Sequence, residues 1–250
     1  MTLKKIKIEI LGLKINRINY EDYLNQINTA INENEKLIIM YANANTLNII
    51  QKHNNLKCIY EVADIIQPDG TGLYLASIFL FKENKLPIRF LGSDFFIQYL
   101  IPEILKRKWS IFFLGDKDET LSKVKEKYPD MNIVGVKNGF DYKNEEIIDS
   151  INSSKPDILL IGLGTPKQEI FIYQNYKNIN AKVILPVGDG IKVFAGTKVR
   201  GPKFIQKIGL EWLVRTFYSP KKYFKRYFFG NPIFIFRILK QKFSNVISKN

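Results

Sequence analysis

Short apolar runs alternate with longer amphipathic stretches between residues 36 and 186 of the chain. The apolar runs predict strands at residues 37–42, 63–66, 88–91, 110–114, 132–136, 158–161 and 183–185. The intervening stretches predict helices at residues 46–53, 71–81, 94–106, 117–127, 144–152 and 166–175. Strands separated by single helices favour right-handed crossovers between parallel strands. We therefore expect an α/β fold, a Rossmann-like and mostly parallel sheet with helices on both faces.

The N-terminal pattern predicts one more strand. Apolar Ile6, Ile8 and Ile10 alternate with Lys7 and Glu9, and the segment lacks the apolar core of a signal peptide. The longest apolar stretches elsewhere in the chain are far shorter than the ~20 residues needed to cross a bilayer. We therefore expect a cytoplasmic protein without a membrane-spanning segment.

The last fifth of the chain differs in composition from the rest. Residues 198–250 carry thirteen Lys and Arg against a single acid, Glu211, and hold most of the chain's net charge of +14. They are also rich in Phe and Tyr. We therefore predict a Rossmann-like body at residues 1–197 and a basic, aromatic-rich appendage at residues 198–250.

The appendage is expected to end in a basic amphipathic helix. Its apolar stripe follows i, i+3, i+7, i+10 spacing at Phe236, Leu239, Phe243 and Val246. Basic and aromatic residues together fit either an anionic membrane surface or nucleic acid. The continuous stripe favours the membrane, because stacking platforms for single strands are more often scattered over sheets. A helix docked on its own core with a solvated basic face explains the stripe equally well.

Composition limits the chemistry that the chain can perform. Of 250 residues 46% are hydrophobic and 25% are charged, so a sizeable core can form and global disorder is excluded. The chain has one cysteine, Cys58, and one histidine, His53. An intramolecular disulfide and a Cys- or His-rich metal site are therefore excluded. Asp116 and Asp118 follow a predicted strand, but two acids there are more typical of a helix start than of a metal site. Catalysis is therefore expected to use carboxylates, amides, hydroxyls or cations.

Polar residues follow the first two core strands, where parallel sheets bind ligands. Asn43 and Asn45 come after the first strand, and Asp69 lies in a Pro-Asp-Gly-Thr-Gly segment after the second. A carboxylate at that edge could accept a proton from a hydroxyl as a general base. Taken alone, the segment is more simply an Asp-Gly turn or helix cap. Caps also explain Asn43 and Asn45 as well as ligand contact does.

A glycine-rich turn follows the sixth strand. Gly162 and Gly164 could let a phosphate approach the backbone before the next helix begins. The same segment satisfies a capping box, with Thr165 as the N-cap residue and Gln168 at position N3. Capping and ligand binding explain these two side chains equally well, so the glycines are the better evidence. The spacing is not the dinucleotide-binding fingerprint.

Taken in order, these segments resemble the WecG/TagA/CpsF glycosyltransferases, glycosyltransferase family 26. The resemblance covers about four-fifths of the chain, from residue 38 to residue 227. It rests on Asn43, Pro68-Asp-Gly-Thr-Gly72, Arg89-Phe-Leu-Gly-Ser-Asp94, Phe113-Leu-Gly115, Asn138-Gly-Phe140, Lys155-Pro-Asp157, Gly162-Leu-Gly-Thr-Pro-Lys-Gln-Glu169, Pro186-Val-Gly188, Ala195-Gly196, Arg200-Gly-Pro202 and Leu210-Glu-Trp-Leu-Val-Arg215. The G-x-G-x-P-K-Q-E and L-E-W-x-x-R strings are the most diagnostic.

The resemblance implies an inverting transferase that moves a sugar from a UDP donor to a polyprenyl-diphosphate-linked sugar, without an essential metal or other cofactor. It places the catalytic base on Asp69. The substrate-binding residues that it implies are Asn43, Arg89, Gly162, Gly164, Gln168, Glu169, Arg215, Lys222 and Lys225. The last three belong to the appendage, which in the family closes over the active site and meets the diphosphates.

Three departures from the family pattern concern this site. Lys222 and Lys225 stand where the family usually has Arg, and Lys binds phosphate without the bidentate fork. An acidic position has become Lys192, with Asp189 nearby, which bears on the choice of donor. Tyr41 stands where Thr is common, so one small hydroxyl contact is lost.

The sequence thus predicts a glycosyltransferase of cell-surface polysaccharide or glycolipid assembly, transferring an N-acetylmannosamine-type sugar or another hexose. Its expected partners are the UDP-sugar, the polyprenyl-diphosphate acceptor and the anionic inner face of the plasma membrane, to which it would bind peripherally, and not nucleic acid. The alternative is a noncatalytic basic module that binds nucleic acid or anionic lipid. Which sugar is transferred, and whether the chain forms an oligomer, stay open.

Overall fold

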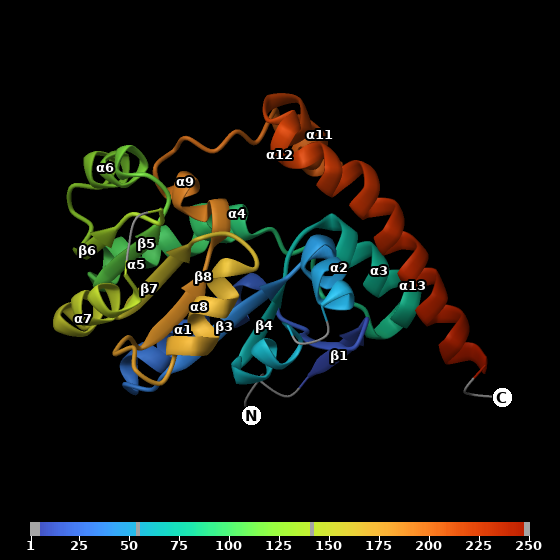
Figure 1. The fold of residues 1–250 in the computed structure, drawn as a ribbon, viewed down its shortest axis with the longest axis horizontal. Helices are drawn as coiled ribbons and strands as arrows, with labels where there is room; N and C mark the ends of the chain where they lie inside the picture. Colours follow the sequence, from blue (N-terminus) through green and yellow to red (C-terminus); the bar gives the residue numbers. More distant parts are fainter. Residues whose placement is uncertain (1–5, 54–55, 141–142, 248–250) are drawn as a thin grey trace.

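The computed structural model describes residues 6–53, 56–140 and 143–247. A six-stranded parallel sheet lies at its centre, with the strand order β4-β3-β8-β7-β5-β6 (Figure 1). The strands are β3 (Leu37–Ala42), β4 (Ile65–Pro68), β5 (Ile111–Gly115), β6 (Ile133–Lys137), β7 (Ile158–Gly162) and β8 (Val183–Pro186). The predicted α/β fold with a mostly parallel sheet is confirmed.

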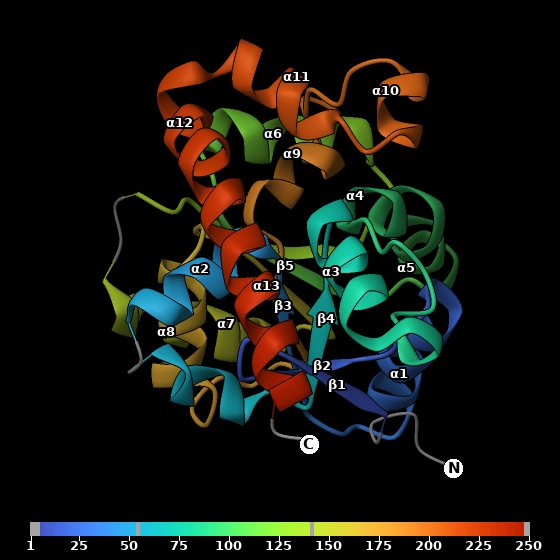
Figure 2. The same cartoon turned by 90° about the vertical axis from the view of Figure 1, so that its right-hand side faces the viewer.

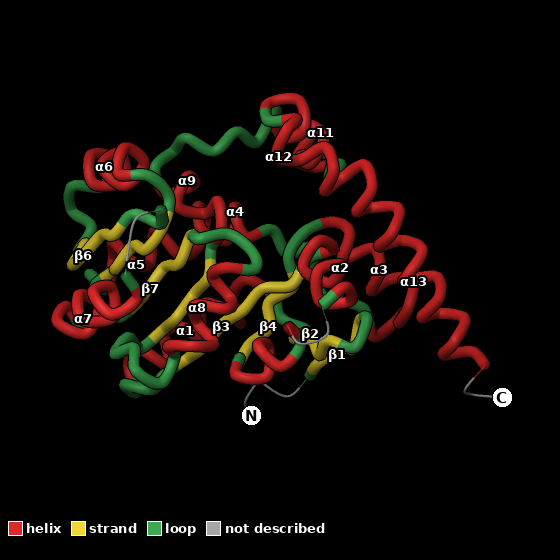
Figure 3. The backbone as a smooth tube through the Cα atoms, in the orientation of Figure 1, coloured by secondary structure: helices red, strands yellow, loops and turns green. Residues whose placement is uncertain are grey.

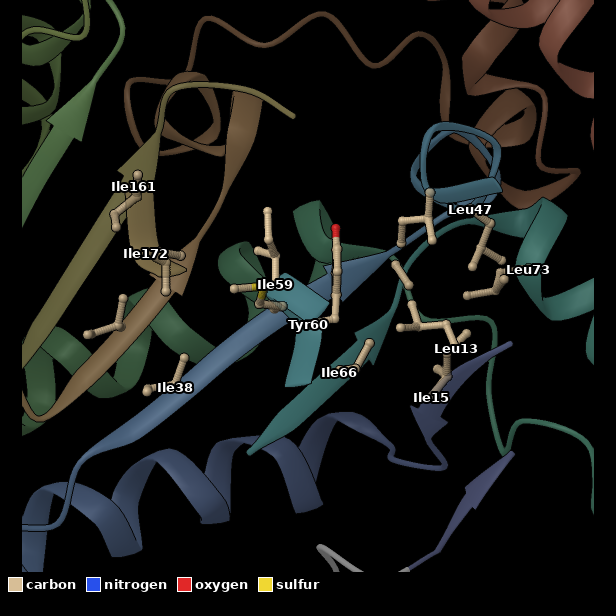
Figure 4. Packing of buried hydrophobic residues seen from close by; sticks show 14 of the residues in the cluster. Leu13, Ile15, Ile38, Leu47, Ile59, Tyr60, Ile66, Leu73, Ile161 and Ile172 are labelled. Carbon is tan, nitrogen blue, oxygen red and sulfur yellow. The ribbon is translucent and has the colours of Figure 1, made fainter. Parts of the chain in front are cut away.

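Helices cover both faces of this sheet (Figures 1 and 2). One face carries α2 (Ala44–Lys52), α3 (Thr71–Phe81), α7 (Asn144–Ser154) and α8 (Lys167–Asn175). The other carries α1 (Tyr20–Asn32), the continuous segment α4 (Gly92–Phe95), η5 (Phe96–Leu100) and α5 (Ile101–Arg107), then α6 (Asp118–Lys127) and α9 (Ile191–Phe194). Neighbouring strand residues point to opposite faces, so Ile38 and Met40 join the first core while Leu37 and Ile39 join the second. Figure 4 shows part of the first core.

A small hairpin precedes the sheet. The predicted N-terminal strand is β1 (Lys7–Ile10), and it pairs antiparallel with β2 (Leu13–Asn16), a strand that the pattern analysis missed. Leu11 and Gly12 both have positive φ, as a two-residue hairpin turn requires. The Asn16 side chain accepts a hydrogen bond from the Ile66 N–H of β4 at 2.9 Å, which ties the hairpin to the edge of the sheet.

Residues 88–91 do not form the strand predicted for them. Phe90 is buried against Tyr20, with ring centroids 4.6 Å apart. The Phe90 carbonyl accepts from the Gly70 N–H, and the Leu91 N–H donates to the Tyr20 hydroxyl. The backbone of this segment therefore forms hydrogen bonds with a loop residue and a side chain instead of a neighbouring strand. Its apolar residues are explained by burial and not by a strand.

The C-terminal part folds back over the body. Residues 197–202 form a connection without helix or strand, drawn as loop in Figure 3. The chain continues through α10 (Lys203–Lys207), α11 (Glu211–Tyr218), α12 (Pro220–Phe224), the π-helical segment η7 (Lys225–Phe229) and the long α13 (Gly230–Ile247). The described part of the predicted appendage is thus mostly helical from Lys203 onward, and its division from the body at residue 198 stays a prediction.

Helix α13 lies across α2 and α3 (Figure 2). It docks through Phe234 and Ile238, which are buried in the first core. Polar contacts support this packing, because Asn48 of α2 donates to the Gly230 carbonyl at 2.7 Å and accepts from Arg237 at 2.7 Å. Apolar and polar contacts therefore both anchor the first half of α13 on the body.

The predicted apolar stripe is not the face through which α13 docks. Phe236 and Phe243 are 67% and 63% exposed, and Leu239 is 40% exposed. The side chain of Val246, the last member of the stripe, lies outside the described part. The helix thus has two apolar faces, one packed on the body and one open to the surroundings.

Within residues 6–53, 56–140 and 143–247, no helix has the length and apolar character needed to cross a membrane.

Candidate active site

A cavity of about 620 Å³ separates the appendage from the sheet. Its floor consists of the segments that follow β4, β3 and β8, three adjacent strands whose carboxyl ends meet at one edge. Its roof consists of some of the side chains between residues 206 and 239 of the appendage, together with Lys198. The cavity therefore lies where parallel sheets bind ligands, as the strand-end analysis predicted.

Amides line the cavity after β3. Asn43 is the N-cap of α2, and its side-chain oxygen accepts from the Thr46 N–H at 3.0 Å. Asn43 and Asn45 both border the cavity. The cap role weighed from the sequence is thus confirmed for Asn43, and its contact with substrate stays a prediction.

Asp69 lines the cavity on the side of the sheet. Its backbone N–H donates to the Ala42 carbonyl at 2.8 Å, and its Oδ1 accepts from the Gly92 N–H at 3.0 Å. The N-cap of α3 is Gly70, whose φ of 90° favours glycine. Asp69 is therefore not the cap of the helix that follows it, and its carboxylate is held facing the cavity by the start of α4.

Three cations line the cavity: Lys198, Arg215 and Arg226. The Nε atoms of Arg215 and Arg226 are buried and lack a hydrogen-bond partner within the described part of the chain. Unsatisfied buried donors are costly, and guanidinium groups bind phosphates well. Two buried guanidinium donors at one cavity therefore favour an anionic ligand.

Lys198 faces the floor from the connecting segment. Its ammonium donates to the Ser93 hydroxyl at 2.9 Å. Burial, reinforced by the nearby Arg215 guanidinium, lowers the pKa of Lys198 to about 8, although Asp189 and Asp69 act in the opposite direction. The sequence analysis missed this residue, because the segment around it has no periodic pattern.

The two lysines implied by the resemblance point elsewhere. Lys222 is exposed and forms an ion pair with Asp189 at 3.0 Å, while Lys225 is exposed and does not border the cavity. Although burial opposes it, the Tyr223 hydroxyl and the Lys222 ammonium hold the pKa of the Asp189 carboxyl well below its usual range. In this structure Arg226 therefore takes the position at the cavity that the resemblance implied for Lys225.

A network of ion pairs fixes Arg215. Glu211 is buried and accepts from Arg215 at 3.0 Å and from Arg200 at 3.1 Å. Arg200 also pairs with Asp94 of α4. The Leu-Glu-Trp-x-x-Arg string thus places Glu211 and Arg215 one helical turn apart, and Arg200 joins them to the body.

Arg89 supports the appendage and does not border the cavity. Its guanidinium donates to the carbonyls of Lys207 and Gln206 at 2.8 and 3.1 Å, at the C-terminal end of α10. A cation there satisfies otherwise unpaired helix carbonyls. The substrate contact implied for Arg89 stays a prediction.

Gln168 and Glu169 form a buried polar network beside the cavity. The Gln168 carbonyl oxygen accepts from the N–H groups of Gly164 and Gly188, and its amide donates to Glu169 at 2.9 Å. The Glu169 carboxylate also accepts from Thr165 at 3.1 Å, and burial raises its pKa. This network braces the loops after β7 and β8, and direct substrate contact of Gln168 and Glu169 stays a prediction.

The capping box proposed for this segment is wrong. Helix α8 begins at Lys167, and no side chain caps its N-terminus. The Thr165 hydroxyl instead bonds with the Tyr41 hydroxyl at 2.7 Å and with Glu169. Tyr41, the departure from the family pattern, therefore joins the cavity to the buried network.

The two glycines after β7 differ in their surroundings. A Cβ atom at Gly162 would lie 2.5 Å from the Ile191 side chain, so packing alone requires glycine there. Gly164 has a φ of 77° and open space where a side chain would be. Neither borders the cavity, so the phosphate contact implied for both stays a prediction.

Within the described part of the chain, no three His, Cys, Asp or Glu side chains lie together in a way that could hold a metal ion. Asp116 accepts from the Lys117 N–H and from Thr120, and it pairs with Lys192 at 3.9 Å. Asp118 begins α6, as the favoured interpretation predicted. A reaction without metal stays a prediction.

Comparison with known proteins agrees with this site. The N-acetylglucosaminyldiphosphoundecaprenol N-acetyl-beta-D-mannosaminyltransferase of Bacillus spizizenii is 28% identical over 218 residues, which cover 86% of this chain and 83% of that protein. The protein of the same name from Staphylococcus aureus strain MRSA252 is 28% identical over 246 residues, 94% and 93% of the two chains. The sequence profile of the Glycosyl transferase WecG/TagA/CpsF family matches residues 8–247. The chain therefore belongs to the WecG/TagA/CpsF family and is a glycosyltransferase.

Proposed function

We propose that the protein transfers an N-acetylmannosamine-type sugar from a UDP donor to N-acetylglucosamine carried on a polyprenyl diphosphate. The names of its relatives in Bacillus and Staphylococcus support this acceptor and this sugar. One structural observation carries the proposal, namely that Asp69 lies in the same cavity as Arg215 and Arg226. A fixed carboxylate opposite two arginines suits a hydroxyl nucleophile and a diphosphate leaving group.

The geometry suggests a single displacement. Asp69 accepts the proton of the acceptor hydroxyl while that oxygen bonds to the anomeric carbon and the bond from this carbon to UDP breaks. Negative charge then develops on the departing diphosphate, where Lys198, Arg215 and Arg226 stabilise it. The sugar inverts its configuration, because attack and departure take place on opposite faces.

A panel of UDP-sugars tests this function. Each is offered with a short-chain polyprenyl-diphosphate-GlcNAc acceptor, and products are identified by mass spectrometry. We expect one added N-acetylhexosamine from UDP-N-acetylmannosamine. Transfer of a different sugar would show that the proposed donor is wrong, and failure to bind any UDP-sugar would contradict the proposed function. The noncatalytic alternative is not favoured, because family membership already makes the chain a glycosyltransferase.

The protein is further proposed to act at an anionic membrane surface. The exposed apolar stripe of α13 supports this, together with the exposed Phe224, Phe228 and Phe229 just before the helix. Basic side chains accompany them on the same appendage, and anionic lipid attracts such side chains. A nucleic-acid surface has less need of a continuous apolar stripe.

Removing two stripe residues should weaken membrane binding. The double variant Phe236→Ser, Phe243→Ser is expected to lose most of its flotation with vesicles of phosphatidylglycerol, because two exposed rings no longer enter the interface. The matched control is Phe140→Ser, which removes a ring 75% exposed in the loop after β6. Equal flotation of the double variant and the wild type would contradict the proposed membrane face.

Lys198 should give the reaction an alkaline limit. With its pKa lowered to about 8, Lys198 is an ammonium below that pH and loses its charge as the pH rises further. The kcat/KM for the UDP-sugar, which reports the free enzyme, should therefore fall above pH 8. Lys198→Arg stays charged throughout and should flatten this limb. An unchanged alkaline limb in this variant would assign it to another group.

A further inference from the structure

One end of the cavity is apolar. Between α3 and α13 its floor consists of the buried Ala76, Phe234 and Ile238. Two matched pairs of larger side chains form its walls, each pair one helical turn apart: Leu75 and Phe79 on α3, and Ile235 and Leu239 on α13. These four side chains are between 40% and 58% exposed.

The two helices run in parallel along this apolar end. A Cβ atom at Gly72 would lie 3.9 Å from the Phe234 ring, and eight residues further along both helices Lys242 donates to the Leu80 carbonyl at 3.2 Å. Eight helical residues span roughly 12 Å. Figure 2 shows α13 running beside α3. The two helices are therefore in contact at both ends of this path, and the apolar walls continue along it.

Along both α3 and α13, a charged residue just before the helix is followed by apolar side chains within it. Asp69 lies just before α3, and Leu75 and Phe79 follow within it. Arg226 lies just before α13, and Ile235 and Leu239 follow within it. The catalytic carboxylate and the diphosphate-binding cation thus share one end of the cavity, while apolar walls lead away from it.

The composition of α3 supports a bound apolar ligand. Nearly every residue of α3 is apolar, and a helix that is apolar on all sides is normally buried on all sides. Leu73, Ala76 and Leu80 pack into the core, yet Leu75 and Phe79 stay open to the cavity. Contiguous exposed apolar surface of this kind commonly marks a site that binds a ligand, a protein or a membrane.

From this juxtaposition we infer that the groove between α3 and α13 binds the first isoprene units of the acceptor lipid. The inference rests on the proposed function, because it needs an acceptor whose diphosphate joins a sugar to an apolar chain. With that diphosphate at Arg226, the chain extends between the two apolar walls of α3 and α13. The groove would then contact the lipid chain directly. Leu239 belongs both to its wall and to the membrane-facing stripe, so the two surfaces adjoin.

Two acceptors that differ only in their lipid test the groove. GlcNAc-diphosphate is joined either to one isoprene unit or to a geranylgeranyl chain of four, and both are assayed without vesicles. For the double variant Leu75→Ser, Phe79→Ser we expect a rise of about tenfold in KM for the longer acceptor, as loss of about 1.4 kcal/mol of apolar burial would give. The KM for the shorter acceptor and for the UDP-sugar should stay within twofold of wild type.

A second variant guards against misfolding of the first. Ile235→Ser changes an exposed side chain on the opposite wall of the groove, and it should raise the KM for the longer acceptor selectively in the same way. The matched control is Phe204→Ser, Phe217→Ser, which removes two exposed rings of the appendage away from the cavity and should leave both KM values unchanged.

Three outcomes would overturn the inference. Equal KM values for the two acceptors in the wild type would mean that the groove does not bind the chain, even if the proposed transfer is observed. An equal rise in KM for both acceptors in the variant would mean that Leu75 and Phe79 support the structure of the site and do not bind the lipid chain. A wild-type dimer that Leu75→Ser, Phe79→Ser converts to monomers would make the groove a contact between copies. Absence of transfer to either acceptor would instead refute the proposed function itself.

Discussion

Replacing Asp69 with Asn is expected to lower kcat by about 10²- to 10⁴-fold, the usual cost of losing a general base. An amide keeps the size of the carboxylate but cannot accept the acceptor's proton. Two other carboxylates, Asp189 and Glu211, also line the cavity. Both are already paired with cations, Asp189 with Lys222 and Glu211 with two arginines, so we expect neither to replace Asp69 as the base. Steady-state kinetics with saturating UDP-sugar and acceptor measure the effect.

The fold of this variant should be unaffected. Asp69 Oδ1 accepts from the Gly92 N–H, and the carbonyl oxygen of Asn can accept the same hydrogen bond. We therefore expect Tm and the affinity for UDP-sugar to stay near wild type. Asp118→Asn is the matched control, because Asp118 also follows a strand of the sheet but does not border the cavity. A lower Tm or lost UDP-sugar binding in Asp69→Asn would mean that Asp69 has a structural role. A wild-type kcat would mean that another group accepts the proton.

The sheet was predictable because its strands are buried on both faces and so read as continuous apolar runs. Helix α1 was missed although its signals are visible, since Asn19 caps it and Tyr23, Ile27 and Ile31 recur at helical spacing. The error at residues 88–91 has the opposite cause. An apolar run indicates only that a segment is buried. Whether it forms a strand or a loop depends on its hydrogen-bond partners, here Gly70 and Tyr20, which the local pattern does not reveal.

The strand-end positions of the site were also predictable from topology, since parallel strands bring Asn43 and Asp69 to one edge. Of the three cations at the cavity, the family resemblance implied Arg215, but Lys198 and Arg226 were not predicted. Lys222 pairs with Asp189, and Lys225 begins the π-helical segment η7. A π-helical turn holds more residues than an α-helical turn, so it shifts which side chain faces inward. Helical spacing alone cannot tell Lys225 from Arg226.

The apolar stripe of the appendage illustrates a further limit of periodicity. Spacing predicted a stripe containing Phe236 and Phe243, and this stripe exists, but α13 docks through Phe234 and Ile238 instead. Both sets fit a helical repeat. Only the position of α2 and α3 beneath the helix decides which set is buried.

The choice between Lys225 and Arg226 leads to the second large effect. Arg226→Ala is expected to lower kcat/KM by about 10- to 150-fold, because a charge-assisted hydrogen bond to a diphosphate contributes about 1.5 to 3 kcal/mol. Arg226 faces the cavity with a buried and unpaired Nε, so its removal breaks no ion pair of the protein within the described residues. Kinetics with each substrate varied in turn, together with Tm, measure the effect.

Lys225→Ala is the matched control, since it removes the neighbouring cation from an exposed position outside the cavity. Its kcat/KM should stay within about twofold of wild type, because exposed charges contribute little to binding in water. Arg226→Lys should recover part of the loss, since Lys supplies the charge without the planar fork that pairs with two phosphate oxygens. If Lys225→Ala instead shows the larger defect, the appendage rearranges when substrate binds, and the residue implied by the family resemblance is the one that meets the diphosphate.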